Sequence, residues 1–285
     1  MAFAVARAPA RPCFPDTLCG GICQEKQSKS EHDGKRGGMS ASRRRLVGVG
    51  VGPGDPELVT VKAVRRMREA DVVLVPVMAL DEPGRAEATV REHVDDRSIE
   101  RVVFALNDRG GRSERRVRAW DEAARAVVRH FESGDRTVAF ATIGDPNVYS
   151  TFSYLAQTVR DLDPDVEVET VAGITAMQDL AARSCSVLAE GTEPLTLLPV
   201  TSGVDRLQEA LSGDATVVAY KFGRFAPEVM AALRATGRLE DAVYGSRLGL
   251  DDERIAPAAK LEGEEIPYLS TLIAPAHRSE RGGKL

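Results

Sequence analysis

The chain has 285 residues, of which 43% are hydrophobic and 28% charged, and its net charge at pH 7 is −5. The first 45 residues carry a net charge of +5, so the rest carries −10; this acidic body disfavours nucleic acid as a partner, because phosphate binding needs a basic surface. No apolar run reaches the roughly 20 residues that span a bilayer, and the N-terminus is too interrupted for a signal sequence, so we expect a cytoplasmic protein without a membrane partner.

Residues 1–40 show no hydrophobic periodicity and are rich in polar and charged side chains. Such a segment cannot bury enough apolar area to fold, so we expect a disordered extension. Met39 is then a plausible start of the native protein. At the other end, the polar residues 277–285 are expected to be a frayed tail.

Three of the four cysteines, Cys13, Cys19 and Cys23, lie in the predicted extension. Their spacing matches no zinc ligand set, and His32 is the one histidine near them. The four histidines are scattered along the chain and form no ligand set either. We therefore expect no metal site.

From residue 44 onward, short apolar runs typical of strands alternate with runs that repeat apolar residues at helical spacing. Strands are predicted at residues 46–51, 72–75, 138–142, 166–171, 195–198, 216–219, 242–244 and 268–273, and helices at 58–70, 113–130, 149–162, 175–183, 205–211 and 227–236. This alternation predicts an α/β fold with largely parallel sheets. The length suggests two domains, and we place them at 44–172 and 173–276.

The segment GVGVGPGDPELVT, residues 48–60, directly follows the first predicted strand. Its glycines let the backbone turn sharply or approach a ligand closely. A dinucleotide-binding loop needs G-x-G-x-x-G, but in the registers that start at Gly48 and Gly50 the third position holds Pro53 or Asp55. The acid expected at the end of the second strand is also missing. From this loop alone, two roles remain possible: a rigid edge of a ligand-binding site, or a tight turn with a purely structural role.

A second loop, TIGDPNVYSTFSYL at residues 142–155, follows another buried strand. It carries more hydrogen-bonding groups than a strand-to-helix turn requires. The hydroxyls of Ser150 and Thr151 fit either a ligand contact or a simple helix cap. Tyr149 and Tyr154 are more typical of core positions than of ligand contacts.

Three motifs, in order along the chain, resemble those of the tetrapyrrole (precorrin) methylases. They are Gly50-x-Gly-Pro-Gly-Asp-Pro-Glu-Leu-x-Thr, then Gly144-Asp-Pro after a mid-chain strand, then Gly173-Ile-Thr-Ala after the next strand. Each motif alone is weak, whereas the ordered combination over residues 46–273 is specific. Ala172 departs from the family pattern, which usually has proline there.

Further strings are similar to one branch of this family, the precorrin-2 C(20)-methyltransferases. They are Gly144-Asp-Pro-Asn-Val-Tyr-Ser-Thr-Phe-Ser-Tyr-Leu, Glu190-Gly-Thr-Glu-Pro-Leu-Thr-Leu-Leu-Pro and Pro267-Tyr-Leu-Ser. The uroporphyrinogen-III branch carries a Tyr-Asp pair at the end of the second strand, where this chain has Val75-Pro76. The resemblance therefore favours the precorrin-2 branch.

The resemblance implies two α/β domains with S-adenosylmethionine in a cleft between them, and a homodimer. The positions that match the family's cofactor contacts are Pro53, Ile143, Gly144, Asp145, Val148, Thr175, Ala176, Lys221, Phe222 and Leu248. Precorrin-2 bears eight carboxylates, so polar and cationic residues should face it; the candidates are Ser150, Thr151, Arg109, Arg112 and Arg224, with Lys221 as a rival. The basic segment around Arg109 fits a solvated helix face equally well.

The activity implied is methyl transfer from a sulfonium to the C-20 meso carbon of precorrin-2, in cobalamin biosynthesis. Because the tetrapyrrole is itself the nucleophile, the protein needs mainly to align methyl and carbon and to exclude water, which can contribute roughly 7–11 kcal/mol. No metal or nucleophilic side chain is required. Asp55 and Asp145 are the candidates for a base that takes up the displaced proton.

Other functions stay open at this point. Within the family they are the cobalt-factor II C(20)-methyltransferase and other precorrin methylases. Outside it, a nucleotide-binding oxidoreductase would need the fingerprint glycine and second-strand acid that this chain lacks. A ligand-binding protein without turnover is the remaining alternative.

Overall fold

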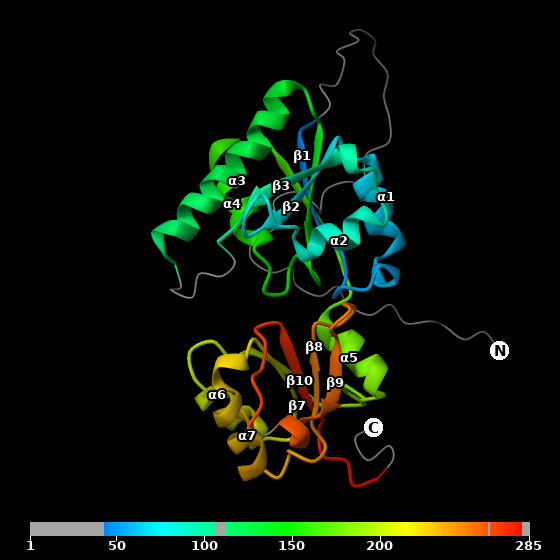
Figure 1. Cartoon of the computed structure of the whole chain (residues 1–285), viewed down its shortest axis with the longest axis vertical. Coiled ribbons are helices and arrows are strands. Elements are labelled where there is room, and N and C mark those ends of the chain that lie inside the picture. The colour runs from blue at the N-terminus through cyan, green and yellow to red at the C-terminus, as the bar shows by residue number, and fades with distance from the viewer. Residues whose placement is uncertain (1–42, 106–111, 262, 281–285) are drawn as a thin grey trace, which may run out of the picture. The chain divides into compact units, whose positions relative to one another are not determined.

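The computed structural model describes residues 43–105, 112–261 and 263–280 (Figure 1). Ser42–Leu285 forms one compact unit. The predicted extension at 1–40 lies outside the described residues, as do residues 281–285 of the predicted tail. No described helix is both long and apolar enough to cross a membrane.

The first sheet contains five parallel strands in the order β3-β2-β4-β1-β5. They are β1 (Arg45–Gly50), β2 (Val72–Val77), β3 (Ile99–Val103), β4 (Thr137–Thr142) and β5 (Glu167–Val171). The central strands are buried on both faces, which explains why they read as continuous apolar runs in the sequence. In the pairing of β1 with β4, Val47 lies beside Ala139.

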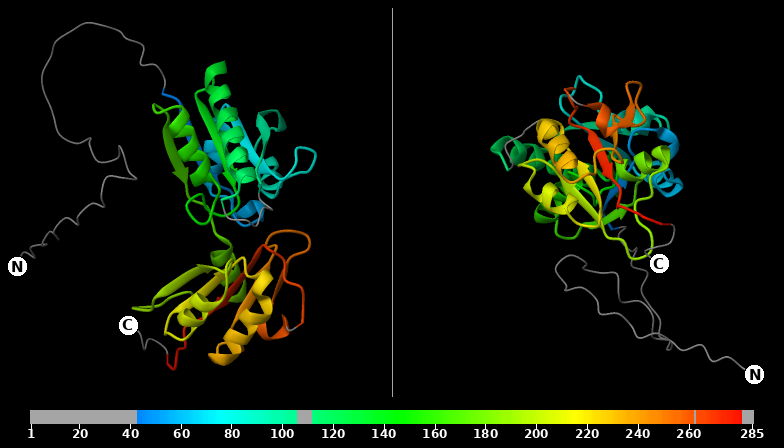
Figure 2. Two further views of the ribbon diagram at one scale, coloured as in Figure 1. Left: turned by 90° about the vertical axis from the view of Figure 1, so that its left-hand side faces the viewer. Right: turned by 90° about the horizontal axis from the view of Figure 1, so that it is seen from below.

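Helices cover both faces of this sheet (Figures 1 and 2). One face is covered by α3 (Glu114–Ser133) and α4 (Phe152–Leu162), and the other by α1 (Val61–Glu69) and α2 (Arg85–Arg91). On the first face, Val127 and Leu155 pack with Phe140 in one core cluster. On the second face, Met67 packs with Val73 in another.

The ends of these helices follow from the local sequence. Ser113 caps α3, its hydroxyl accepting a hydrogen bond from the amide of Arg116 at 3.1 Å. The same helix ends at Gly134, whose φ of +112° suits a residue without a side chain. Thr60 caps α1 by accepting from the amide of Ala63 at 3.1 Å. The predicted Ser113 cap is confirmed.

The second sheet is mixed, with the order β6-β7-β10-β8-β9. Its strands are β6 (Leu195–Pro199), β7 (Thr216–Tyr220), β8 (Val243–Ser246), β9 (Arg254–Pro257) and β10 (Ser270–Ala274). Only β6 and β7 are parallel neighbours. The expectation of largely parallel sheets therefore holds for the first sheet and is wrong here. Between β8 and β10 the described residues contain β9 and, as their only helix, the short η4 (Ala258–Leu261); antiparallel neighbours need no crossover helix.

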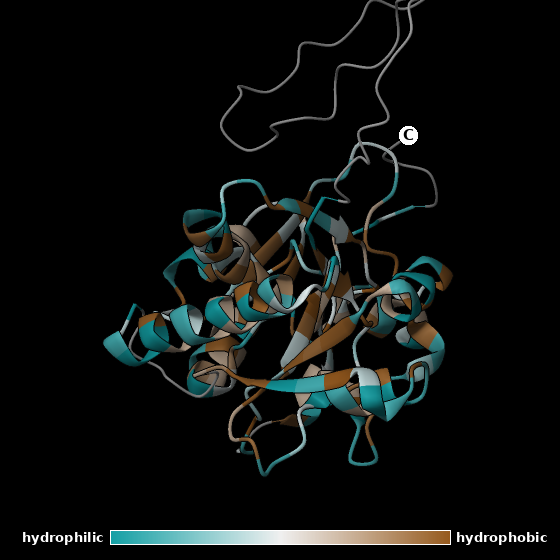
Figure 3. Cartoon of the chain, turned by 90° about the horizontal axis from the view of Figure 1, so that it is seen from above, coloured by the Kyte–Doolittle hydropathy of each residue, from teal (hydrophilic) through white to brown (hydrophobic). Residues whose placement is uncertain are grey.

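Helices also cover both faces of the second sheet. One face is covered by α5 (Ala176–Ser184), and the other by α6 (Asp205–Leu211) and α7 (Ala226–Ala235). Leu180 of α5 packs with Ile273, while Leu233 of α7 packs with Leu272, so successive residues of β10 face opposite cores. Figure 3, in which the first sheet and its helices lie in front, shows largely hydrophobic strands between helices that are largely hydrophilic outside.

Three elements are absent from the predicted list, namely α2, β3 and β9. Two predicted helices also begin later than expected. The helix predicted at 58–70 is divided into the 3-10 helix η1 (Pro56–Leu58) and α1, because Thr60 starts a new helix as its cap. The helix predicted at 149–162 begins at Phe152, since Tyr149 has a left-handed φ of +50°.

Candidate cofactor site

Three loops leave the first sheet at the carboxyl ends of the neighbouring strands β4, β1 and β5. We call them loop 1 (residues 51–60, after β1), loop 2 (143–151, after β4) and loop 3 (172–175, after β5). Loop 1 leads to α1 on one face of the sheet, and loop 2 leads to α4 on the other. In open parallel sheets, ligands bind where neighbouring strands connect to opposite faces in this way.

Glycine backbones hold the three loops together. A Cβ added at Gly50 would lie 2.5 Å from the carbonyl oxygen of Gly144 and 2.6 Å from the amide nitrogen of Gly173. A Cβ added at Gly173 would lie 2.1 Å from the same oxygen. The amide of Gly144 also donates a 2.7 Å hydrogen bond to the carbonyl of Gly52. We call Gly50, Gly144 and Gly173 the glycine contact; residues larger than glycine do not fit at Gly50 and Gly173, whose added Cβ atoms would meet the Gly144 carbonyl.

Asp145 ties loop 2 to loop 3. One carboxylate oxygen accepts from the amide of Gly173 at 2.9 Å, and the other accepts from the amide of Asn147 at 2.8 Å. Asp55 has a comparable role in loop 1, where it caps η1 by accepting from the amide of Glu57 at 2.8 Å. Both candidates for a catalytic base therefore hold loop backbone in place.

Loop 3 runs into α5, and Thr175 precedes the helix. The amide and hydroxyl of Thr175 both donate to the side-chain carbonyl of Gln178, at 2.9 and 3.0 Å. The amide of Met177 donates to the hydroxyl of Tyr220 at 2.9 Å, which fixes the start of α5 against the end of β7. Burial raises the pKa of Tyr220, so this hydroxyl stays protonated. Ala176 is the first residue of the helix.

Loop 1 is held from two sides. The buried hydroxyl of Thr89, in α2, donates to the carbonyl of Gly54 at 3.1 Å. The turn after β8 lies against the same residues: a Cβ added at Gly54 would lie 2.3 Å from the carbonyl oxygen of Leu248, and one added at Gly249 would lie 2.0 Å from the amide nitrogen of Asp55. Pro53, which precedes Gly54, is buried. The second sheet therefore helps to fix loop 1.

The remaining predicted cofactor residues differ in exposure. Ile143 is partly buried against the core of α1 and α2. The amide of Val148 donates to the carbonyl of Asp145 at 3.2 Å and closes the turn of loop 2. Phe222 is fully buried in the core of the second sheet, and Leu248 packs in the α5 cluster. Their contact with a cofactor stays a prediction.

The two hydroxyl residues predicted to face the substrate lie at the start of α4. The Ser150 hydroxyl accepts from the amide of Phe152 at 3.1 Å and lies 3.0 Å from that of Thr142. Of the two predicted roles for Ser150, a ligand contact or a helix cap, these contacts correspond to the cap. Thr151 is the residue that precedes the helix, and its side chain makes no capping hydrogen bond.

The predicted cationic residues are not brought together. Arg224 is exposed, with its guanidinium 5.5 Å from the centre of the Phe225 ring. Arg112 is exposed just before α3, where it lines a shallow hollow with Glu114 and other α3 residues. Arg109 lies outside the described residues.

The sequence interpretation missed an exposed aromatic cluster beside loop 2. Tyr149 is 44% exposed and Tyr154 is 50% exposed, so the expectation that they are core residues is wrong. Tyr154 stacks on Trp120 with 4.5 Å between ring centres. The Lys221 ammonium lies 5.7 Å from the centre of the Tyr149 ring and 5.8 Å from that of Tyr268. The signal available in the sequence was the string Pro267-Tyr-Leu-Ser.

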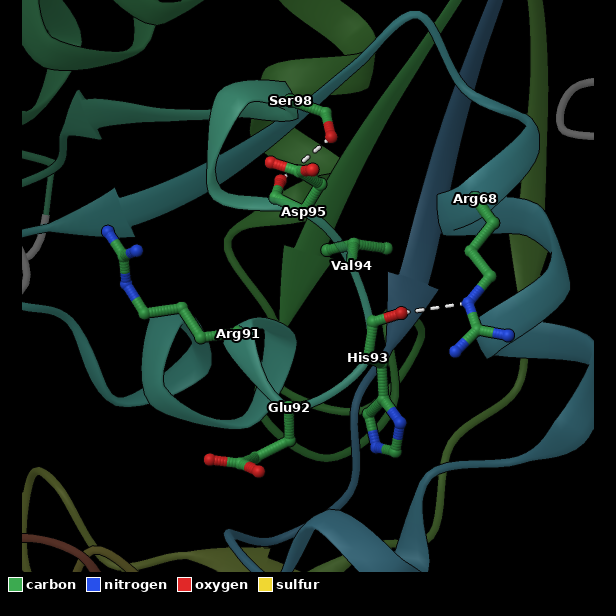
Figure 4. Close-up of a pocket in the computed structure, with 7 residues that line it drawn as sticks. All are labelled: Arg68, Arg91, Glu92, His93, Val94, Asp95 and Ser98. Carbon is green, nitrogen blue, oxygen red and sulfur yellow. Dashed lines mark hydrogen bonds between the residues drawn. The ribbon is translucent and has the colours of Figure 1, made fainter.

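A surface pocket of about 430 Å³ lies elsewhere, between the end of α1 and the segment after α2 (Figure 4). Arg68 crosses it and donates a 2.8 Å hydrogen bond to the carbonyl of His93. The His93 ring in turn lies 2.9 Å from the carbonyl oxygen of Pro56. None of the predicted site residues lines this pocket, although the contact between His93 and Pro56 joins its wall to loop 1.

Comparison with known proteins agrees with this geometry. The family model "Tetrapyrrole (Corrin/Porphyrin) Methylases" matches residues 45–262. The chain is 33% identical over 237 residues to a precorrin-2 C(20)-methyltransferase of Sinorhizobium sp, covering 81% of this chain and 95% of the relative. It is 28% identical over 233 residues to a cobalt-precorrin-2 C(20)-methyltransferase of Salmonella typhimurium, covering 80% and 95%. The crystal structure of the methyltransferase CobJ matches with a TM-score of 0.60 at 20% identity, over 85% of this chain and 98% of that one. The predicted family and fold class are confirmed, and the chain belongs to the tetrapyrrole (corrin/porphyrin) methylases.

Proposed function

We propose that the protein transfers a methyl group from S-adenosylmethionine to C-20 of precorrin-2 in cobalamin biosynthesis. The observation that carries this proposal is the 33% identity to the Sinorhizobium enzyme, which extends over 95% of that enzyme. The family membership supports a tetrapyrrole substrate and S-adenosylmethionine as the methyl donor. The sequence strings shared with the precorrin-2 branch support the position of methylation.

The residues around the glycine contact fit the methyl donor. Gly144 has a φ of +71°, and a Cβ added there would meet no atom within 4 Å, so its backbone borders open space. Glycine in such a conformation lets a ligand approach the backbone closely. The residues that would hold the donor are Pro53 of loop 1, Gly144 of loop 2, Thr175 of loop 3 and Ala176 at the start of α5.

When bound, S-adenosylmethionine supplies a methyl group on a positively charged sulfur, which is already a good electrophile. The chain's own residues have to position that methyl group and exclude water. Loop 1 is suited to this because the contacts of Thr89 and Gly249 fix it, and loop 2 because Asp145 ties it to loop 3. The hydrogen bonds of Asp55 and Asp145 favour a positioning role over that of a base.

The oxidoreductase alternative fits the loops less well. A dinucleotide pyrophosphate binds at the N-terminus of a helix that opens directly after the first strand. Here β1 ends at Gly50, and α1 begins only at Val61, after the bend of loop 1 and the 3-10 helix. The geometry therefore supports the methyltransferase over this alternative.

Incorporation of a labelled methyl group tests the proposal. The protein is incubated with S-adenosylmethionine labelled in the methyl group and with precorrin-2, and the tetrapyrrole is isolated. Label at C-20 is expected, and a tetrapyrrole without label would overturn the proposal. Cobalt-factor II is tested in parallel because the Salmonella relative carries the name of a cobalt-precorrin-2 enzyme; a higher kcat/KM for the cobalt form would assign this chain to the cobalt branch.

The homodimer and the domain division are proposals of the same kind. Separate core clusters in the two sheets support domains at 44–172 and 173–276. The homodimer rests on the family resemblance alone. Sedimentation velocity at several concentrations tests it, and a species with the mass of one chain throughout would overturn it.

A further inference from the structure

We propose that Tyr149, Lys221 and Tyr268 form a binding site for a carboxylate of the tetrapyrrole, with the macrocycle lying against the tyrosine rings. We call these three residues the tyrosine–lysine clamp. The proposal rests on the proposed function, and it assigns Lys221 to the substrate rather than to the methyl donor.

The clamp is assembled from three distant segments. Tyr149 belongs to loop 2, Lys221 directly follows β7, and Tyr268 precedes β10. The pairing of β7 with β10 brings the last two together, since Lys221 donates its amide to the carbonyl of Ser270 at 3.2 Å. The Lys221 ammonium then lies near both rings, 5.7 Å from the centre of Tyr149 and 5.8 Å from that of Tyr268.

The charge of Lys221 is not balanced by the residues around it. No carboxylate of the described residues forms an ion pair with this ammonium. The faces of its two aromatic neighbours attract the positive charge but accept no conventional hydrogen bond from it. An ammonium has three donors, so its hydrogen-bonding capacity is left for an anion. A carboxylate is the anion that the proposed substrate offers most abundantly.

Both rings are exposed, and neighbouring residues hold that of Tyr149 in place. Tyr149 and Tyr268 are 44% and 54% exposed, which leaves apolar ring surface for a planar conjugated ligand. The Tyr149 hydroxyl donates to the carbonyl of Leu197 at 3.1 Å, and its ring meets that of Tyr220 edge-on. The Tyr149 ring is therefore ordered before any ligand binds, which lowers the entropy cost of binding against it.

Two of the three clamp residues have strained backbones. Tyr149 has a φ of +50° and Lys221 a φ of +61°, both in the left-handed region that residues other than glycine rarely adopt. Such strain is concentrated at binding and catalytic sites, where the surrounding structure enforces it. Here the two residues with left-handed φ values meet, with the Lys221 ammonium 5.7 Å from the centre of the Tyr149 ring.

The clamp also lies next to the predicted cofactor residues. Tyr149 follows Val148 in loop 2, and Tyr220, which precedes Lys221, accepts the hydrogen bond from Met177 at the start of α5. A macrocycle held at the clamp would thus be adjacent to the methyl donor. This proximity is what transfer between the two ligands requires.

Lys221→Met tests the role of the charge, with Lys260→Met as the matched control. Lys221 is half-buried and Lys260 is exposed; Lys260 follows β9, whose end pairs with the start of β8 and so lies at the opposite end of the second sheet. We expect Lys221→Met to raise the KM for precorrin-2 about tenfold, equivalent to about 1.4 kcal/mol, with an unchanged Kd for S-adenosylmethionine by calorimetry. Lys221→Arg should retain most of the wild-type KM, and Lys260→Met all of it. The wild-type KM should also rise with salt, and that of Lys221→Met should rise less.

The stacking role is tested by Tyr268→Leu, which should raise the same KM with an unchanged melting temperature. An unchanged KM in both Lys221→Met and Tyr268→Leu would overturn the clamp. A weaker Kd for S-adenosylmethionine in Lys221→Met would overturn it too, since the lysine would then serve the methyl donor.

Binding of uroporphyrin III separates the clamp from the proposed function. This planar octacarboxylate can be titrated by fluorescence without any turnover. Weaker binding in Lys221→Met than in Lys260→Met supports the clamp even if no methyl group is transferred to precorrin-2, in which case only the proposed reaction fails. Equal binding in the two variants overturns the clamp.

Discussion

The glycine contact and the tyrosine–lysine clamp are built in opposite ways. At the glycine contact, three backbones approach so closely that Cβ atoms added at Gly50 and Gly173 would lie 2.5 and 2.1 Å from the carbonyl oxygen of Gly144. At the clamp, two tyrosine rings and one ammonium are separated by nearly 6 Å and about half of each ring is exposed. The first region therefore depends on the absence of side chains and the second on their chemistry. Substitutions should affect folding in the first region and ligand binding in the second.

Gly173→Ala should have the largest effect. Its Cβ would lie 2.1 Å from the carbonyl oxygen of Gly144, and backbone cannot move aside as a flexible side chain can. We expect a loss of roughly 3 kcal/mol in the free energy of unfolding, measured in urea. Methyl transfer should fall about 100-fold, because a displacement of about 1 Å in the positioning loops has an effect of that size.

Gly213→Ala is the control, since its Cβ would meet only the Ala210 carbonyl oxygen, at 3.5 Å. A change within about 0.5 kcal/mol is expected there. If the two variants lose the same free energy of unfolding, the backbones of loops 2 and 3 do not approach as closely as described.

Glu87→Gln tests the support behind loop 1. Glu87 is fully buried in α2, two residues before Thr89, which holds Gly54. Burial raises the pKa of the carboxyl, but hydrogen bonds from Arg101, from Arg91 and from the amide of Gly84 outweigh burial and lower the pKa to about 2. We expect the variant to lose roughly 2–3 kcal/mol at pH 7, as hydrogen bonds to a charged group contribute about that much.

The pH dependence has a definite sign. The folded pKa of Glu87 lies below its ordinary value of 4.5, so its stabilisation is complete above that pH and is lost as the pH falls toward 2. The difference in unfolding free energy between the wild type and Glu87→Gln should therefore narrow over this range. Glu82→Gln, at an exposed position, should show no such difference at any pH. A difference in unfolding free energy that does not change with pH would contradict the hydrogen bonds assigned to the ionised Glu87.

Asp179→Asn should have a smaller effect, and of opposite sign. Asp179 is 5% exposed in α5, and one of its carboxylate oxygens is buried without a hydrogen bond. Burial raises its pKa; Arg183 lowers it, and the charges of Glu253 and Asp55 raise it further. The ionised carboxylate of Asp179 therefore destabilises the folded state. The free energy of unfolding falls as the pH rises from the unfolded pKa of about 3.9 to the higher pKa of the folded state.

We expect Asp179→Asn to gain about 1 kcal/mol at pH 7, the scale of one unsatisfied buried group, and to lose this advantage at acidic pH. Thermal unfolding at both pH values measures the change. Asp165→Asn, at an exposed position, is the control and should match the wild type at both. A lower melting temperature for Asp179→Asn at pH 7 would show that the carboxylate stabilises the fold.

The contrast between backbone and side-chain construction also explains what the sequence could predict. Gly50 lies next to the end of a predicted strand, and Gly144 and Gly173 each come two residues after one, so their meeting at one end of the sheet could be inferred from the order of the motifs. Tyr268 and Lys221 are brought together by the register of β7 with β10, which no local pattern specifies. Tyr149 was interpreted as core because it is aromatic, whereas its left-handed backbone turns the ring outward.

The missed elements have a related cause. β3 and β9 are edge strands of their sheets and only partly buried, so their apolar signal is weak. The helix α2 has seven residues, and among its buried positions are the polar side chains Glu87 and Thr89. A pattern of apolar residues cannot reveal an element whose buried positions are partly polar.

Tyr149→Phe should have the smallest effect and divides the clamp into its parts. The substitution keeps the ring beside Lys221 and removes only the hydrogen bond from the Tyr149 hydroxyl to the Leu197 carbonyl. This hydrogen bond is exposed to solvent. We expect a loss of about 0.5–1 kcal/mol in the free energy of unfolding and about a twofold rise in the KM for precorrin-2, since the ring is then held less firmly. Tyr154→Phe is the control, because the Tyr154 ring stacks on Trp120 and its hydroxyl has no hydrogen bond to the described residues. A tenfold rise in KM for Tyr149→Phe would mean that the hydroxyl itself, and not the ring, contacts the substrate.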